Sequence, residues 1–115
     1  MQTVVETPGY LAAAKAAGIS DVIRADIASV VAANPGIGDL IVGSGGLRKF
    51  RFARQGAGKS GGFRILSYFN SSELPVFLIG AFAKSERANL TRAETNQIAA
   101  RLKAMASEYA RRERR

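Results

Sequence analysis

The chain has 115 residues, the length of one domain, and 47% of them are apolar, which suffices for a core that buries about 65% of the unfolded surface. Seventeen Lys and Arg residues against nine Asp and Glu give a formal net charge of +8. The chain contains no Cys and no His, which excludes disulfides, thiolate nucleophiles, histidine bases and the usual Cys and His metal ligands, so no metal or cofactor is expected.

The chain begins with a predicted strand and a short helix. Residues 2–6 alternate as a short strand does. Thr7 and Pro8 are typical of an N-cap followed by the first helical position. The alanine-rich helix that they open is expected to run to about Ala17, where Gly18 stops it.

A second helix is predicted to begin after Ser20, an N-cap residue, and to end at residues 34–36, Asn-Pro-Gly. The two helices should form a hairpin that packs on one face of a sheet. The apolar residues around and within the second helix recur at spacings of three and four and are expected to enter the core. They are Ile19, Val22, Ile23, Ile27, Val30 and Val31.

A β-hairpin is predicted in the middle of the chain. A brief strand at 39–42 and a glycine-rich turn at 43–46 precede it. Two strands, starting at Leu47 and near Phe63, flank a long connection rich in glycine. Because side chains alternate along a strand, Phe50 and Phe52 should face the core while Lys49 and Arg51 face outward together.

The last third predicts a buried strand and a long helix. Residues 76–83 are nearly all apolar, as in a sheet strand covered on both sides. Residues 91–94, Thr-Arg-Ala-Glu, form a capping box, and the helix after it carries one apolar side: Ile98, Leu102, Met105 and Tyr109. The expected fold is a single α+β domain over residues 1–115 with the order βααββββα.

Charge is unevenly distributed along the chain. Residues 1–40 carry two cations and four acids, residues 41–72 carry six cations and no acid, and residues 73–115 carry nine cations and five acids. Clustered cations beside Phe and Tyr are suited to phosphate and base contacts, so a polyanion is the expected partner. The alternative is a basic protein whose charge serves solubility alone.

Several motifs are incomplete. Residues 58–60, Gly-Lys-Ser, resemble the end of a phosphate-binding P-loop, but Ala53 stands where that pattern needs glycine, and a strand is predicted to follow instead of a helix. The glycines at 56, 58 and 61 lack the helix of a dinucleotide fingerprint for the same reason. No apolar run of about 18 residues and no secretory signal pattern occur, so a cytoplasmic location without a membrane contact is expected.

Cleavage of RNA is a reaction open to a protein without His, Cys or clustered carboxylates, because the 2′-hydroxyl of RNA supplies the nucleophile. The protein must then accept the 2′ proton, stabilise the charge on the phosphorane, and protonate the 5′ leaving oxygen. Arg and Lys can stabilise that charge, and a lysine among other cations can also transfer protons. The same cations would equally hold backbone phosphates without catalysis.

Three segments in order resemble the HigB-like branch of the RelE/ParE toxins: residues 45–49 (Gly-Gly-Leu-Arg-Lys), 58–65 (Gly-Lys-Ser-Gly-Gly-Phe-Arg-Ile) and 82–91 (Phe-Ala-Lys-Ser-Glu-Arg-Ala-Asn-Leu-Thr). The resemblance implies the toxin half of a type II toxin–antitoxin pair and a cognate antitoxin, a helix-turn-helix DNA-binding protein. RelE-like members cleave messenger RNA on the ribosome without a metal. ParE-like members inhibit DNA gyrase without cleaving RNA, and a non-catalytic nucleic-acid-binding module is a further alternative.

The resemblance also implies roles for individual residues. Lys49 and Arg51 match the paired cations of the third strand, which hold phosphates, and Arg64 matches the arginine that stabilises the phosphorane. Lys84 follows the last strand, and Glu86 is either a proton acceptor or a salt-bridge partner of its basic neighbours. The chain departs from RelE in having Ser85 and Leu90 near an expected arginine and tyrosine. Further RNA contacts are expected from Arg48, Arg54, Lys59, Tyr68 and Phe82.

Overall fold

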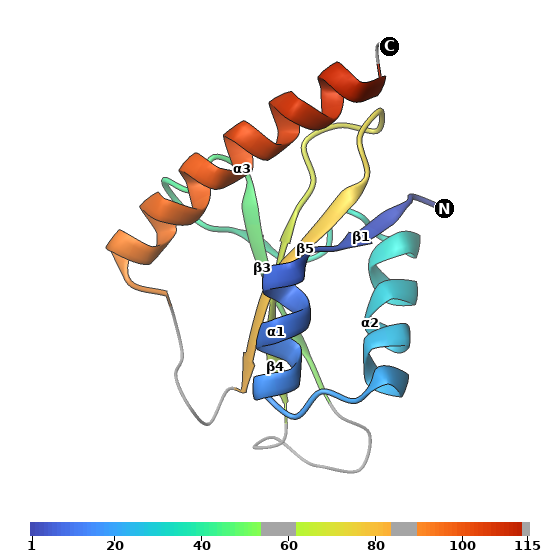
Figure 1. Cartoon of the computed structure of the whole chain (residues 1–115). Coiled ribbons are helices and arrows are strands. Elements are labelled where there is room, and N and C mark those ends of the chain that lie inside the picture. Colours follow the sequence, from blue (N-terminus) through green and yellow to red (C-terminus); the bar gives the residue numbers. More distant parts are fainter. Residues whose placement is uncertain (54–61, 84–89, 114–115) are drawn as a thin grey trace.

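The computed structural model describes residues 1–53, 62–83 and 90–113, and its elements follow the predicted order βααββββα (Figure 1). The elements are β1 (Val4–Glu6), α1 (Pro8–Ala16), α2 (Asp21–Ala33), β2 (Asp39–Leu40), β3 (Leu47–Phe52), β4 (Phe63–Tyr68), β5 (Val76–Ala83) and α3 (Arg92–Glu113). The predicted α+β class is confirmed. Most of the glycine-rich connection between β3 and β4, residues 54–61, lies outside the described residues.

The sheet has the strand order β1-β5-β4-β3-β2. β1 and β5 pair in parallel, and the other neighbours pair antiparallel. β5 therefore has a hydrogen-bonded strand on each side, as its apolar sequence predicted. The β3–β4 hairpin is also confirmed, with Leu47 opposite Tyr68 and Phe52 opposite Phe63.

The predicted helix caps are present. The Thr7 hydroxyl accepts from the amide of Tyr10 at 3.2 Å and donates to the Leu78 carbonyl at 2.8 Å, which ties the start of α1 to β5. At the start of α3, the Thr91 amide donates to the Glu94 carboxylate at 2.9 Å, and the Glu94 amide donates to the Thr91 hydroxyl at 3.1 Å. This reciprocal pair is the predicted capping box.

One face of the sheet packs against α1 and α2. Ile27 and Val31 of α2 are fully buried there, and Ile23 packs against the same cluster. Val22 and Val30 do not enter the core, however, because 73% and 38% of their surfaces are exposed. The prediction for these two was wrong because each lies one residue before a position that packs against the core, which is a rotation of about 100° around the helix axis.

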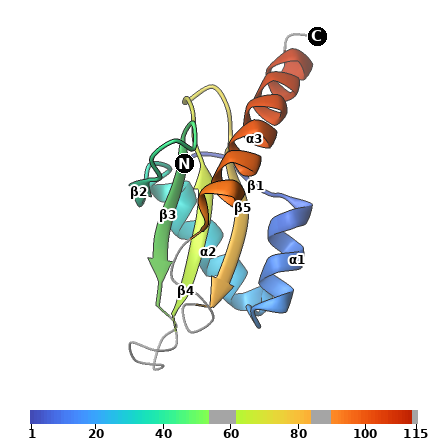
Figure 2. The ribbon, with the colours of Figure 1, turned by 90° about the vertical axis from the view of Figure 1, so that its left-hand side faces the viewer.

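The other face of the sheet packs against α3. Leu102 is buried in this second cluster, where Ile98, Met105 and Tyr109 also pack, as predicted. The ring of Tyr109 meets Phe77 edge to face, with centroids 5.7 Å apart. Figure 2 shows the strands between α3 in front and α2 behind. β5 is therefore covered on both sides.

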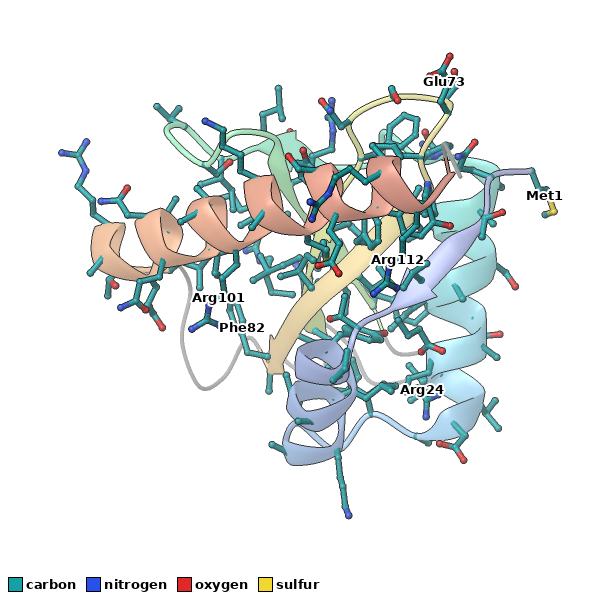
Figure 3. The ribbon with its side chains drawn as sticks, turned by 45° about the horizontal axis from the view of Figure 1, so that its top comes forward. Met1, Arg24, Glu73, Phe82, Arg101 and Arg112 are labelled. Atoms are coloured by element: carbon teal, nitrogen blue, oxygen red, sulfur yellow. The ribbon has the colours of Figure 1, made fainter. Side chains whose placement is uncertain are left out.

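Tyr10 of α1 is fully buried, and its hydroxyl has no hydrogen-bond partner among the described residues. Burial raises the pKa of Tyr10 to about 12, and the Glu6 carboxylate acts in the same direction. Arg24 lowers the pKa of Tyr10 and so opposes both effects. It extends from α2 in Figure 3 and forms an ion pair with Glu6 at 2.9 Å. Because the folded-state pKa lies above the ordinary 10.0, the neutral phenol contributes stability below pH 10 that is lost as the pH rises towards 12.

Tyr10→Phe is therefore expected to leave the free energy of unfolding at pH 7 unchanged or slightly higher, because no hydrogen bond is lost and an unpaired buried hydroxyl is removed. It should also reduce the loss of stability between pH 10 and pH 12. Urea unfolding of the parent and the variant at pH 7, pH 10 and pH 12 measures the two effects. A clear loss of stability at pH 7 would show that the hydroxyl has a partner.

Candidate functional site

A cleft of about 590 Å³ opens on the α3 side of the sheet. Strands β3, β4 and β5 form its floor, residues 41–43 form one wall, and the first turns of α3 form the other. Three of its lining residues are cations, Lys49, Arg64 and Arg92, and no Asp or Glu lines it within the described parts of the chain. We call it the basic cleft.

Strand alternation places the hairpin cations. Phe50 is buried with α1 and α2, whereas Lys49 and Arg51 lie on the opposite, α3 face, as predicted. In the sheet register, Arg51 of β3 lies opposite Arg64 of β4, and Arg64 in turn lies opposite Phe82 of β5. The structure thus brings Lys49, Arg51 and Arg64 together, although that face is partly covered by α3 and is not simply outward.

Arg64 carries an unsatisfied donor. Its side chain is half-buried, and its Nε is shielded from solvent without a hydrogen-bond acceptor among the described residues. A buried donor without a partner costs about 1–3 kcal/mol, and more when it is charged. An anionic ligand in the basic cleft would supply the missing acceptor.

Arg92 was not among the predicted site residues, yet it lines the basic cleft from the first position of α3. A cation at a helix N-terminus is electrostatically unfavourable, because the helix dipole places partial positive charge there. That mismatch is a sequence signal that could have singled it out. Together, Arg92 and the α3 N-terminus add positive potential opposite Lys49 and Arg64.

Two predicted RNA-contact residues lie elsewhere. Arg48 is on the sheet face opposite Lys49, where its Nη1 donates to the Gly38 carbonyl at 3.2 Å. Its Nε is also buried without an acceptor in the described parts, but outside the basic cleft. Tyr68 is 5% exposed and packs against Phe77, with ring centroids 6.4 Å apart. Burial raises the pKa of Tyr68, whose ring belongs to the core cluster on the α3 side of the sheet.

Phe82 lines the basic cleft, although only 8% of its surface is exposed. The remaining predicted residues lie outside the described residues: Arg54, Lys59, Lys84 and Glu86. Within the described ranges, no group of three or more Asp or Glu residues could hold a metal ion.

The fold and the basic cleft define a small basic α+β protein with a cationic cleft on one face of its sheet. Residues 9–115 match the family described as RelE toxin of the RelE / RelB toxin-antitoxin system, and the chain belongs to this family. It is therefore a toxin with a cognate antitoxin as its partner. No helix in the described ranges is long and apolar enough to cross a membrane.

Proposed function

We propose that the protein is a ribosome-dependent messenger RNA endonuclease, the activity for which RelE toxins are known. The observation that supports this best is the unsatisfied Nε of Arg64 in a cleft that contains further cations and, among its described lining residues, no acid. Such a cleft favours a ligand with concentrated negative charge, and an RNA phosphate meets that requirement.

In the proposed reaction, the 2′ oxygen attacks the adjacent phosphorus, the new O2′–P bond forms, and the bond from phosphorus to the 5′ oxygen breaks. The products are a 2′,3′-cyclic phosphate and a 5′-hydroxyl. Arg64 donates to the non-bridging oxygens as their charge increases in the phosphorane. Lys49 and Arg51 hold the scissile and neighbouring phosphates, and the Lys49 ammonium can deliver a proton to the leaving 5′ oxygen.

The proton acceptor comes, in our proposal, from the segment that follows β5 in sequence, where Glu86 is the candidate and Lys84 a further phosphate contact. Glu86→Gln keeps the size of the side chain and removes the basic oxygen. If Glu86 serves only as a salt-bridge partner, the variant should cleave RNA at the parental rate.

Translation in vitro on a defined message, followed by mapping of the RNA 3′ ends, tests the proposal. Cuts within codons that appear only with ribosomes support it. An intact message together with loss of DNA supercoiling would instead show a gyrase-directed toxin.

Binding to RNA is expected to weaken steeply with salt. Each phosphate contact releases about 0.7 counterion from a single strand, so three or four contacts give a slope of about −2 to −3 for log association constant against log salt. Fluorescence anisotropy with a labelled single-stranded RNA measures this slope. A slope near zero would contradict phosphate recognition by the basic cleft.

A further inference from the structure

A second cavity lies further along the same side of α3. It measures about 430 Å³ and is bounded by the middle of α3, by the loop at Gly43 and Gly45, and by Tyr68 and Asn70 at and after the end of β4. Gly43 lines both this cavity and the basic cleft. The second cavity and the basic cleft are therefore adjacent and meet at Gly43.

Five of the α3 residues that line the two cavities form one stripe along the helix. Their spacings of three and four residues place them on the same side: Arg92, Asn96, Ala99, Lys103 and Ser107. At 1.5 Å per residue, the stripe runs about 22 Å along the helix. We call the basic cleft and the second cavity together the α3 trough.

The wall opposite α3 is held firmly. Ser44 is fully buried; its hydroxyl donates to the Ile41 carbonyl at 2.6 Å and accepts from the Leu47 amide at 3.0 Å. At Gly46, φ is +123°, and an added Cβ would lie 2.9 Å from the Tyr68 ring. The loop thus packs directly on the core.

The charge of the trough differs from that of the surface across the helix. No acid lines the trough among the described residues, and Lys103 adds a cation beyond those of the basic cleft. On the other side of α3, a cavity of about 480 Å³ is lined mainly by apolar groups and includes both Glu94 and Arg101. Figure 3 shows Arg101 on that side, near Phe82.

We propose that the α3 trough is an extended path for single-stranded RNA, in which the nucleotides on one side of the scissile phosphate continue past the basic cleft to Lys103. This inference rests on the proposed function. Lys103 would contact a backbone phosphate, and the Asn70 amide and Ser107 hydroxyl can reach bases or 2′-hydroxyls. The small side chains of Ala99 and Ala106 let a sugar-phosphate backbone approach the helix closely.

The test uses two pairs of variants on the same helix. Lys103→Gln removes a charge from the trough, and Arg101→Gln removes one from the opposite side. Ala100→Glu adds an acid to the trough, and Gln97→Glu adds one opposite. All four sites are exposed positions on α3, so the fold should be preserved.

Anisotropy titrations would compare a trinucleotide RNA with the same trinucleotide lengthened at its 5′ or its 3′ end. Lengthening at one end should strengthen binding to the parent. Lys103→Gln should weaken binding of that longer RNA by about two- to fivefold, as expected for an exposed ion pair, and leave the trinucleotide unchanged. The slope of log association constant against log salt for Lys103→Gln should be less steep than that of the parent by about 0.7. Ala100→Glu should act in the same direction, and the opposite-side controls should match the parent.

Equal behaviour of Lys103→Gln and Arg101→Gln, or no gain on lengthening either end, would overturn the extended path. The proposed function would still stand if the parent cuts messages on ribosomes. Failure of the parent to cut would refute the proposed function, whereas the binding titrations do not depend on cleavage and report on the trough separately.

Discussion

Arg64→Ala should lower the rate of messenger RNA cleavage by about 10²–10³-fold, equivalent to about 2.7–4 kcal/mol of transition-state stabilisation. The effect is large because the interaction between the guanidinium and the non-bridging oxygens becomes stronger as negative charge develops on the phosphorane. Binding of ribosomes should change much less, since the other cleft cations, Lys49 and Arg92, remain. The measurement is single-turnover cleavage of a message on purified ribosomes.

The folding of Arg64→Ala is expected to be nearly intact, because its Nε makes no hydrogen bond with the described residues that could be lost. Arg101→Ala is the matched control, since Arg101 lies on the opposite side of α3 and should cleave at the parental rate. Arg64→Lys keeps the charge but lacks the planar guanidinium, so its cleavage rate should lie between those of Arg64→Ala and the parent. Parental cleavage by a folded Arg64→Ala protein would rule out the assigned role.

Gly38→Ala should destabilise the fold by about 2–5 kcal/mol. This range adds the cost of a positive backbone φ for alanine to the cost of overpacking. At this position φ is +96°, a region that L residues rarely adopt. A Cβ would lie 2.4 Å from the backbone oxygen of Lys49 and 3.0 Å from the Cβ of Phe50. The clash is with strand backbone, so relief requires β2 to move away from β3, next to Lys49 of the basic cleft.

Gly36→Ala is the control for Gly38→Ala. Gly36 is not among the glycines with positive φ, and an added Cβ would meet nothing within 4 Å. Because alanine restricts the unfolded chain, this variant should be neutral or more stable by up to about 1 kcal/mol. Urea unfolding followed by circular dichroism measures both variants, and equal midpoints would show that the β2–β3 contact is adaptable.

The order and type of the elements could be predicted from the sequence because their signals are local. The Thr7 and Ser20 caps and the Thr91–Glu94 box each act over three residues, and the structure contains all of them. Alternation along β3 likewise placed Phe50 and Lys49 on opposite faces. Charge distribution and the resemblance pointed to the hairpin as the functional region, and the family match bears out the toxin class.

The composition of the basic cleft depends on contacts between distant segments. Arg92 joins Lys49 and Arg64 only because α3 packs back across the sheet through Leu102, an arrangement that no local pattern of charges encodes. Arg48, adjacent to Lys49 in sequence, is carried to the other face by the pleat of the strand. Local propensities therefore specified the elements, whereas the burial of two apolar sheet faces selected which cations share one cleft.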